Sequence, residues 1–346
     1  MQPNYFSQLP RAYLIAEIGV NHNGDTDLAR KLVVAAKRAG ADAVKFQTFT
    51  AASLVTPGTP KVRYQNDSTA PDESHFDMLR KLELGEAEHR EMVSWCAEVG
   101  IAFLSTPYDV ESARFLDGLG VSMFKTASAD LVDLPLQRYV ASTGKPVIVA
   151  TGMASLGEVE RVVNIFESLG NPHLVLLHCV SNYPCSDASL NLRAMNTLAH
   201  AFQLPVGYSD HSDGFLAAVA AVAMGAAIIE KHFTLDKTLP GPDHRASSTP
   251  EEFSELAQNV RRAELMLGSP RKVRQAEEQQ MAEVSRKSVV LARAMRAGET
   301  ITADDLRLMR PGTGIPASVM PVIEGRRVLK DLDALHRLRW YDIEGV

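Results

Sequence analysis

Short apolar runs recur along the first three quarters of the chain, and helix-like segments lie between them. The runs are continuously rich in Val, Ile and Leu, which favours parallel strands buried on both faces. Apolar residues at helical spacing mark residues 26–39, 155–169 and 250–267. The predicted strands are residues 13–19, 43–49, 102–107, 123–128, 146–152, 174–180, 205–211 and 227–234.

Eight alternating strand and helix units predict an α/β fold, a (β/α)8 TIM barrel. A doubly wound open sheet is the alternative. It is disfavoured because the Gly-x-Gly-x-x-Gly phosphate turn is missing after the first strand, where Gly19-Val-Asn-His-Asn-Gly24 stands instead. The long polar connection of residues 50–85, which contains Pro71, is typical of a lid over the barrel mouth.

A second domain is predicted after the barrel. Residues 1–268 form the barrel domain, residues 269–285 a charged linker, and residues 286–346 a small β-rich domain. The last part carries a turn at Ala297-Gly-Glu299, a capping-box-like Thr302-Ala-Asp-Asp305, and Arg310-Pro-Gly.

Composition narrows the possible functions. The 346 residues are 45% hydrophobic and carry a formal net charge of -6, and no Lys/Arg block resembles a nucleic-acid footprint. Cys96, Cys179 and Cys185 lack CxxC spacing, so we expect reduced thiols. No signal pattern or membrane-spanning apolar run is evident, so we expect a cytoplasmic protein without membrane or nucleic-acid partners.

Candidate catalytic residues lie where the predicted strands end, which is where TIM barrels hold their active sites. Because side chains alternate along a strand, Lys45 shares a face with Gln47, Ser209 with His211, and Glu230 with His232. We expect these faces to point inward. The residues are Glu17, Lys45, Gln47, Lys125, Ser128, Ser209, His211, Glu230 and His232.

His211 and His232 end adjacent strands at matching heights, so two imidazoles can approach one ion and leave positions open for water and substrate. This pattern predicts a labile divalent metal such as Mn²⁺, although zinc, cobalt or iron would fit the same ligands. The alternative is that each histidine only forms hydrogen bonds at the barrel mouth.

Lys45 and Lys125 need anionic partners inside a barrel. A substrate carrying phosphate and carboxylate groups would supply them, and pairing with Glu17 or Glu230 is the alternative. Glu17 is a candidate general base toward water. Glu230 is either a support for His232 or an ion-pair partner.

Three further segments have weaker signals. Asn21-His-Asn-Gly24 is explained by turn chemistry or by contact of His22 with substrate. Pro240-Gly-Pro-Asp243 is either a plain turn or a loop that offers Asp243 to sugar hydroxyls. His178 and Cys179 are assigned to the core, and Cys185 to a loop.

These segments together resemble the N-acylneuraminate (sialic acid) synthase family over essentially the whole chain. The last domain resembles the antifreeze-like (SAF) domain of these enzymes. The motifs are Ala16-Glu-Ile-Gly-Val-Asn-His-Asn-Gly24, Ala43-Val-Lys-Phe-Gln-Thr48, Phe103-Leu-Ser-Thr-Pro107, Thr151-Gly-Met153, Gly207-Tyr-Ser-Asp-His211, Glu230-Lys-His-Phe-Thr234 and Pro240-Gly-Pro-Asp243.

The resemblance implies a transferase that joins phosphoenolpyruvate to an N-acyl amino sugar and holds Mn²⁺ between His211 and His232. Arg310 would reach the acyl group from the partner protomer of a domain-swapped homodimer. The implied phosphoenolpyruvate ligands are Lys45, Lys125, Ser128, Ser181 and Ser209, and the implied sugar ligands are Gln47, Tyr183 and Asp243.

Two departures from the family pattern concern the phosphate. Ala150 stands where relatives often have Ser, and Ser181 where they often have Asn or Thr. We therefore expect a phosphate hydrogen bond to be either lost or replaced, with Thr151 as a candidate replacement.

We expect N-acetylmannosamine as acceptor, which gives N-acetylneuraminate. The alternative acceptor is 2,4-diacetamido-2,4,6-trideoxymannose, which gives legionaminate. Pseudaminate is less expected, because its synthases should lack Pro-Gly-Pro-Asp. A non-catalytic carbohydrate-binding protein is the remote alternative, and it has no use for converged Glu, Lys and His side chains.

Overall fold

The computed structural model describes residues 3–69 and 72–345, so Pro71 lies outside the described residues. The chain divides into two compact units, residues 1–268 and 269–346, which are described separately.

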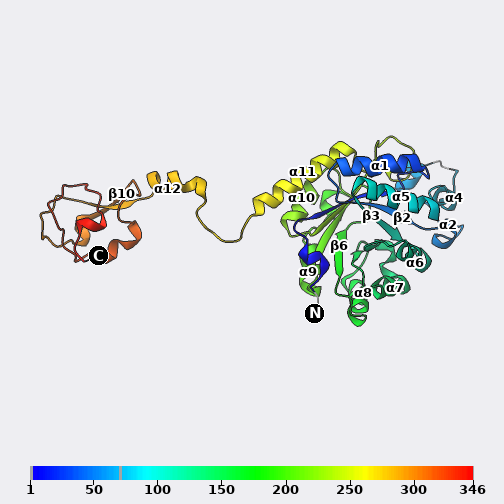
Figure 1. Cartoon of the computed structure of the whole chain (residues 1–346), viewed down its shortest axis with the longest axis horizontal. Helices are drawn as coiled ribbons and strands as arrows, with labels where there is room; N and C mark the ends of the chain where they lie inside the picture. The colour runs from blue at the N-terminus through cyan, green and yellow to red at the C-terminus, as the bar shows by residue number, and fades with distance from the viewer. Residues whose placement is uncertain (1–2, 70–71, 346) are drawn as a thin grey trace. The chain divides into compact units, whose positions relative to one another are not determined.

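The first unit is built on eight parallel strands in the order β3-β2-β1-β8-β7-β6-β5-β4. The end strands β3 and β4 also contact each other, so the sheet curls into a near-closed ring with helices around it (Figure 1). The predicted barrel is confirmed, and the doubly wound alternative is wrong. The strands are β1 (Tyr13–Gly19), β2 (Ala43–Thr48), β3 (Ala102–Pro107), β4 (Phe124–Thr126), β5 (Val147–Ala150), β6 (Leu174–Cys179), β7 (Val206–Asp210) and β8 (Ile228–His232).

Helices cover the outer face of the strands. Their starts are set by local capping: Asp25 accepts hydrogen bonds from the first turn of α1, and Ser155 and Thr249 form capping boxes with Glu158 and Glu252. The helices are α1 (Thr26–Arg38), α5 (Glu86–Val99), α6 (Val110–Gly118), α7 (Leu134–Ser142), α8 (Leu156–Ser168), α9 (Ala194–Phe202), α10 (Leu216–Ala223) and α11 (Pro250–Leu267).

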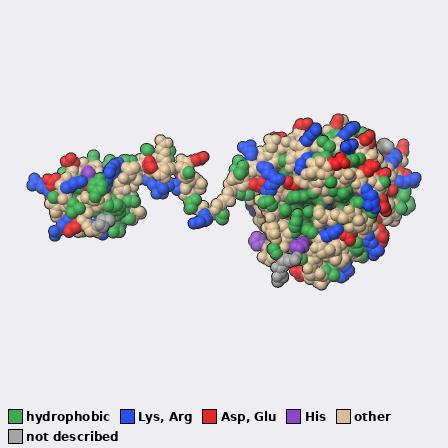
Figure 2. Space-filling model, in the orientation of Figure 1, with side chains coloured by type: hydrophobic (Ala, Val, Ile, Leu, Met, Phe, Trp, Pro, Cys, Tyr) green, Lys and Arg blue, Asp and Glu red, His purple; other side chains and the backbone are tan. Residues whose placement is uncertain are grey.

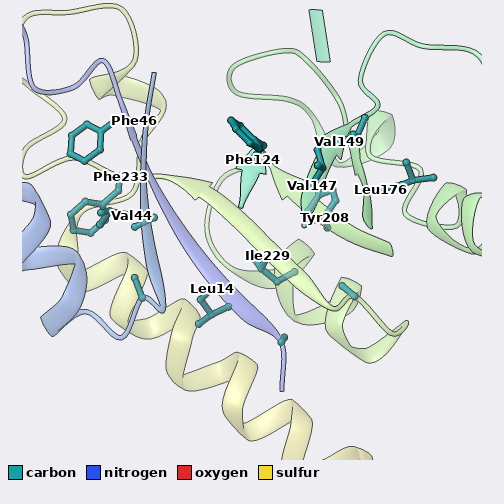
Figure 3. Packing of buried hydrophobic residues seen from close by; sticks show 14 of the residues in the cluster. Leu14, Val44, Phe46, Phe124, Val147, Val149, Leu176, Tyr208, Ile229 and Phe233 are labelled. Carbon is teal, nitrogen blue, oxygen red and sulfur yellow. The ribbon is translucent and has the colours of Figure 1, made fainter. Parts of the chain in front are cut away.

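The main core fills the layer between strands and helices. Outward-facing strand residues such as Leu14, Val44, Val147 and Ile229 are fully buried there (Figure 3). This layer is apolar because both the strand face and the helix face turn away from water.

A second apolar cluster fills the start of the barrel interior. Ile15, Leu104, Ile148 and Ile228 point inward near the strand starts, and Phe6 from the 3₁₀ turn η1 (Tyr5–Gln8) packs against them. The side-chain amide of the N-cap residue Asn4 donates to the carbonyl of Leu174 (2.8 Å) and ties this turn to the barrel. The barrel is therefore plugged at its N-terminal end.

The long connection after β2 contains three short helices, α2 (Ala51–Leu54), α3 (Arg63–Ser68) and α4 (His75–Arg80). A small apolar cluster that includes Val20, Phe49 and Met78 holds α2 and α4 against the barrel mouth. The segment is thus not a structureless loop, and its role as a lid stays a prediction.

The second unit has its own small core. Strands β9 (Ser288–Leu291) and β10 (Leu306–Met309) pair antiparallel, and Val289, Leu291, Ile323 and Leu338 are among the buried residues. The remaining elements are η5 (Ala276–Glu278), α12 (Gln279–Ser285), η6 (Ala303–Asp305), η7 (Ala317–Val319), α13 (Met320–Ile323) and η8 (Trp340–Asp342). The connector is therefore helical in part.

The sequence contains no Lys/Arg block that resembles a nucleic-acid footprint. Consistently, Lys/Arg and Asp/Glu side chains are interspersed over the face of the barrel unit shown in Figure 2. Among the described residues, no helix combines the length and apolarity required to cross a bilayer.

Candidate functional site

The barrel interior changes from apolar to polar toward the C-terminal ends of the strands. Inward positions alternate along each strand, so Ile15 is followed by Glu17, and Ile228 by Glu230 and His232. Register places these polar residues at one level, because Glu17 is opposite both Lys45 on β2 and His232 on β8. Strand geometry thus brings together side chains that lie far apart in the sequence.

Four charged side chains converge inside the barrel. Nζ of Lys45 lies 2.7 Å from Oε2 of Glu17 and 3.8 Å from Oε2 of Glu230, and Nζ of Lys125 lies 3.5 Å from Oε1 of Glu230. All four residues are at most 5% exposed. The alternative weighed from the sequence, internal pairing of the lysines with these two carboxylates, is what the structure contains.

The surroundings shift the pKa values of the two carboxyl groups, Glu17 and Glu230, in opposite directions. Burial acts to raise the pKa of Glu230, but Lys125 and Lys45 outweigh it and lower that pKa to about 2. Burial, together with the charge of Glu230, raises the pKa of Glu17 despite its ion pair with Lys45. Glu230 is therefore ionised near pH 7, and Glu17 is the carboxylate suited to exchange a proton.

Neutral side chains orient this cluster. The amide of Gln47 donates to Oε1 of Glu17 (3.1 Å), and the hydroxyl of Ser209 donates to Oε1 of Glu230 (3.0 Å). Lys45 donates to the hydroxyl of Thr106 (2.9 Å). Sequence reasoning did not select Thr106, although its place at the C-terminal end of β3 was the available signal.

The two histidines lie beside each other above the charge cluster. The ring centroids of His211 and His232 are 5.6 Å apart. Nδ1 of His211 lies 2.7 Å from the carbonyl oxygen of Val180, so Nδ1 carries the proton and Nε2 carries the lone pair. Burial lowers the pKa of His211 and, with the neighbouring His211 and Lys45, lowers that of His232 well below its usual range.

The pair fits a metal site with few protein ligands. Both imidazoles are neutral near pH 7, the form that binds metals, and Nδ1 of His232 is buried without a hydrogen-bond partner. Within residues 3–69 and 72–345, no three His, Cys, Asp or Glu side chains are grouped to hold an ion. An ion here would need water or substrate oxygens to complete its coordination.

A compact polar cradle forms where β4, β5 and β6 end. The backbone N–H of Gly152 donates to the hydroxyl of Ser128 (3.0 Å), which also lies 3.1 Å from Sγ of Cys179. A Cβ on Gly152 would clash with the side chain of Ser181. It would also lie only 2.8 Å from Oγ of Ser128 and 2.9 Å from Sγ of Cys179, so only glycine fits. Cys179 is buried, as predicted, and it also lines this cradle.

Thr151, the candidate replacement for the serine that is absent at position 150, directly follows β5. Its hydroxyl donates to the carbonyl of Leu177 (3.0 Å) on the neighbouring strand. The role of Thr151 as a phosphate ligand stays a prediction.

Two loop residues complete the rim. The Tyr183 ring lies 4.1 Å, centroid to centroid, from the ring of His211, and Oδ2 of Asp243 lies 4.0 Å from Nδ1 of His232. Burial and the nearby Glu17 raise the pKa of Asp243 to about 7 against the pull of Lys45.

Two other candidates are not in the cluster. His22 is fully buried, and its Nδ1 accepts from the backbone N–H of Gly24 (3.0 Å), which is the turn role. Arg310 is exposed directly after β10 in the second unit, and its role toward the sugar stays a prediction.

Comparisons with known proteins identify relatives over nearly the whole chain. The NeuB family model matches residues 32–272, and a SAF domain model matches residues 286–344. An N,N'-diacetyllegionaminic acid synthase of Legionella pneumophila is 46% identical over 336 residues, which is 96% of this chain and 94% of the relative. An N-acetylneuraminate-9-phosphate synthase of Mus musculus is 36% identical over 93% of this chain and 89% of its own.

A solved structure is similar as well. The N-acetylneuraminic acid (sialic acid) synthetase of Leptospira borgpetersenii, crystallised with citrate, is 35% identical with a TM-score of 0.70. The match covers 79% of this chain and 90% of that one.

Proposed function

The chain belongs to the NeuB family and carries a SAF domain, and we propose that it condenses phosphoenolpyruvate with the aldehyde of an N-acyl amino sugar. The observation that carries the proposal is the convergence of two lysines, two carboxylates and two neutral imidazoles at the open end of a plugged barrel. A binding module has no need for a buried carboxylate with a raised pKa beside such groups.

The proposed acceptor is 2,4-diacetamido-2,4,6-trideoxymannose, which gives a legionaminate. The support is the higher identity to a legionaminic acid synthase, 46%, than to the N-acetylneuraminate-9-phosphate synthase, 36%. N-acetylmannosamine, the acceptor expected from the sequence alone, is the second candidate because the solved relative is a sialic acid synthetase.

The reaction follows from what the cluster does with charge and protons. C3 of phosphoenolpyruvate forms a bond to the aldehyde carbon, whose oxygen takes a proton, and water adds at C2. Glu17 accepts one proton of that water and passes it to the aldehyde oxygen. The C2 hydroxyl of the adduct loses the other proton to the departing phosphate as the carbon–oxygen bond breaks. Lys45 and Lys125 orient the carboxylate and phosphate groups and offset their charge.

A divalent ion fits the two imidazoles, and the resemblance implies Mn²⁺. Held by His211 and His232, it would polarise the aldehyde oxygen of the sugar.

We also propose that the enzyme works as a homodimer in which Arg310 of one protomer contacts the acyl group in the site of its partner. Support comes from large apolar side chains exposed on α11 and on the connector: Leu265 is 83%, Met266 74% and Met281 65% exposed. Apolar surface of this kind is commonly covered in an assembly.

The proposed reaction is tested by phosphate release from phosphoenolpyruvate with Mn²⁺, with each of the two sugars and with a chelator control. Chelator-sensitive release with the diacetamido sugar at higher kcat/KM is the expected result. Preference for N-acetylmannosamine would make the enzyme a sialate synthase. Release with neither sugar, in metal-loaded dimer, would overturn the proposal.

The shared site is tested by mixing two inactive variants, Glu17→Gln and Arg310→Ala. If Arg310 acts in the partner's site, hybrid dimers contain one intact site and activity returns on mixing. If Arg310 acts within its own chain, the mixture stays as inactive as its components.

A further inference from the structure

An ion pair lies where the barrel is otherwise apolar. Asp210 and Lys231 are partners in the β7–β8 ladder and project outward, on the same strand faces as Tyr208 and Ile229 of the main core (Figure 3). Asp210 is 1% and Lys231 4% exposed. Neither side chain points into the cluster of charges inside the barrel.

The pair is joined by a third residue into a closed network. Nζ of Lys231 donates to Oδ2 of Asp210 (2.8 Å) and to the backbone carbonyl of Ser212 (2.7 Å). Oδ1 of Asp210 accepts from the backbone N–H of Ser212 (2.9 Å) and from its hydroxyl (2.6 Å). Residues 210 and 212 are thereby tied to β8 by side-chain bonds beyond the end of the ladder.

Both histidines of the candidate metal site are sequence neighbours of this hydrogen-bonded network. His211 stands between Asp210 and Ser212, and His232 directly follows Lys231. β7 ends at Asp210, so the ladder does not include His211 itself. The network therefore ties the residues on either side of His211 to β8, whereas the His211 carbonyl accepts from the backbone N–H of Cys185 (2.9 Å) on the other side.

Stability alone is a poor reason for such a pair. Removing two charges from water costs several kcal/mol per ion, and apolar residues of similar volume often serve as well or better in a packed layer. A buried pair gives directional bonds of fixed length, which apolar packing does not.

We infer that Asp210, Lys231 and Ser212 are positioning residues that hold His211 and His232 at the spacing a divalent ion requires. This inference rests on the two-histidine site of the proposed function. Residues behind metal ligands commonly change metal affinity 10–100-fold.

The test measures binding of Co²⁺ to the substrate-free full-length protein by its visible absorption, with Lys231→Met and Asp210→Asn compared to wild type. Each variant should bind roughly 10–100-fold more weakly. Ser212→Ala removes one hydrogen bond and keeps the ion pair, so its loss should be about fivefold.

Arg261→Met is the matched control. It breaks another ion pair of the barrel unit, Arg261 with Asp42 (2.9 Å), by the same cation-to-methionine change. It should lower the Tm and leave the Co²⁺ dissociation constant and absorption spectrum unchanged.

The outcomes separate this inference from the proposed function. If wild type binds Co²⁺, His211→Ala abolishes binding, and Lys231→Met binds as tightly as wild type, the positioning role is overturned and the metal site stands. If His211→Ala binds as well as wild type, the two-histidine site and the inference fail together. Should Lys231→Met not fold, an unchanged dissociation constant in Ser212→Ala overturns the inference.

Discussion

Ionic clusters at the two ends of the barrel use the same kinds of residues in opposite ways. At the N-terminal end, Asp42 accepts from Arg11 (2.7 Å), from Arg261 (2.9 Å) and from the backbone N–H of Leu14 (2.9 Å). Its partner Arg261 also bonds Glu264 and the backbone carbonyl of residue 12. Every charge at this end has a partner within the protein. The cluster links α11 to the starts of the strands, and we call it the N-terminal joint.

At the C-terminal end, the charges are more deeply buried and less fully satisfied. Glu17, Lys45, Lys125 and Glu230 are nearly inaccessible, yet Oε2 of Glu230 makes no hydrogen bond. Unused bonding capacity in a buried place is what a ligand completes. These two clusters therefore differ in how fully their charges are paired, rather than in the presence of charge.

The largest expected effect breaks the C-terminal cluster at its proton-exchanging member. Glu17→Gln should lower kcat by about 10²–10⁴-fold, because the amide cannot accept a proton, and it should also lower the Tm, because the buried Lys45 loses its carboxylate partner at 2.7 Å. Phosphate release and thermal unfolding measure the two effects. Wild-type turnover in this variant would remove Glu17 as the base.

A second variant tests the role of the lysines toward an anion. Lys125→Met should raise the KM for phosphoenolpyruvate roughly 10–100-fold, the value of a charge-assisted hydrogen bond. The KM for the sugar serves as the internal control and should change much less. Equal changes in both values would mean that Lys125 shapes the site without binding the phosphate-bearing substrate.

Breaking the N-terminal joint should lower stability and leave activity intact. Arg261→Met should lower the free energy of unfolding by about 1–3 kcal/mol, because Asp42 and Glu264 lose a cation. Steady-state kcat and both KM values should stay within roughly twofold of wild type. A large loss of activity in a protein of normal stability would contradict the division between joint and site.

The smallest effect concerns a buried carboxylate in the second unit, Asp342. Burial acts to raise the pKa of Asp342, but hydrogen bonds from Lys330, His336 and the backbone of Arg339 lower it overall. Its contribution to stability is therefore present above the unfolded pKa of about 3.9 and is lost as pH falls through the lower folded pKa. Asp342→Asn should lose about 1–2 kcal/mol at pH 7 and little near pH 2.

Trp340 gives a local readout of this prediction. The chain has two tryptophans, so a Trp95→Phe background leaves Trp340 as the reporter of the second unit in urea unfolding. A stability difference between the Asp342→Asn variant and its parent protein that persists undiminished at low pH would contradict the linkage.

The eight barrel strands could be located from the sequence because buried parallel strands have a distinctive continuous apolar pattern. Their ends were overextended: residues 123–128 were predicted where β4 covers Phe124–Thr126. The reason is physical, since side chains such as Ser128 stay partly buried after the ladder has ended. Burial continues into the loops that build the site, whereas backbone pairing does not.

The site was predictable as far as the two-residue period of a strand reaches. That period groups Glu230 with His232 and Ser209 with His211, which the structure brings together. It could not show that Thr151 bonds across to β6, or that Cys179 faces Ser128, because both depend on side-chain direction after the strand has ended.

The plug formed by Phe6 and its apolar neighbours has a consequence for kinetics. Because the barrel interior is closed at its N-terminal end, both substrates and both products must pass through the opening at the C-terminal ends of the strands. The substrate that binds deepest in the barrel has to bind first, and the product formed from it has to be released last. The turnover of this enzyme is therefore expected to follow a compulsory order of binding and release.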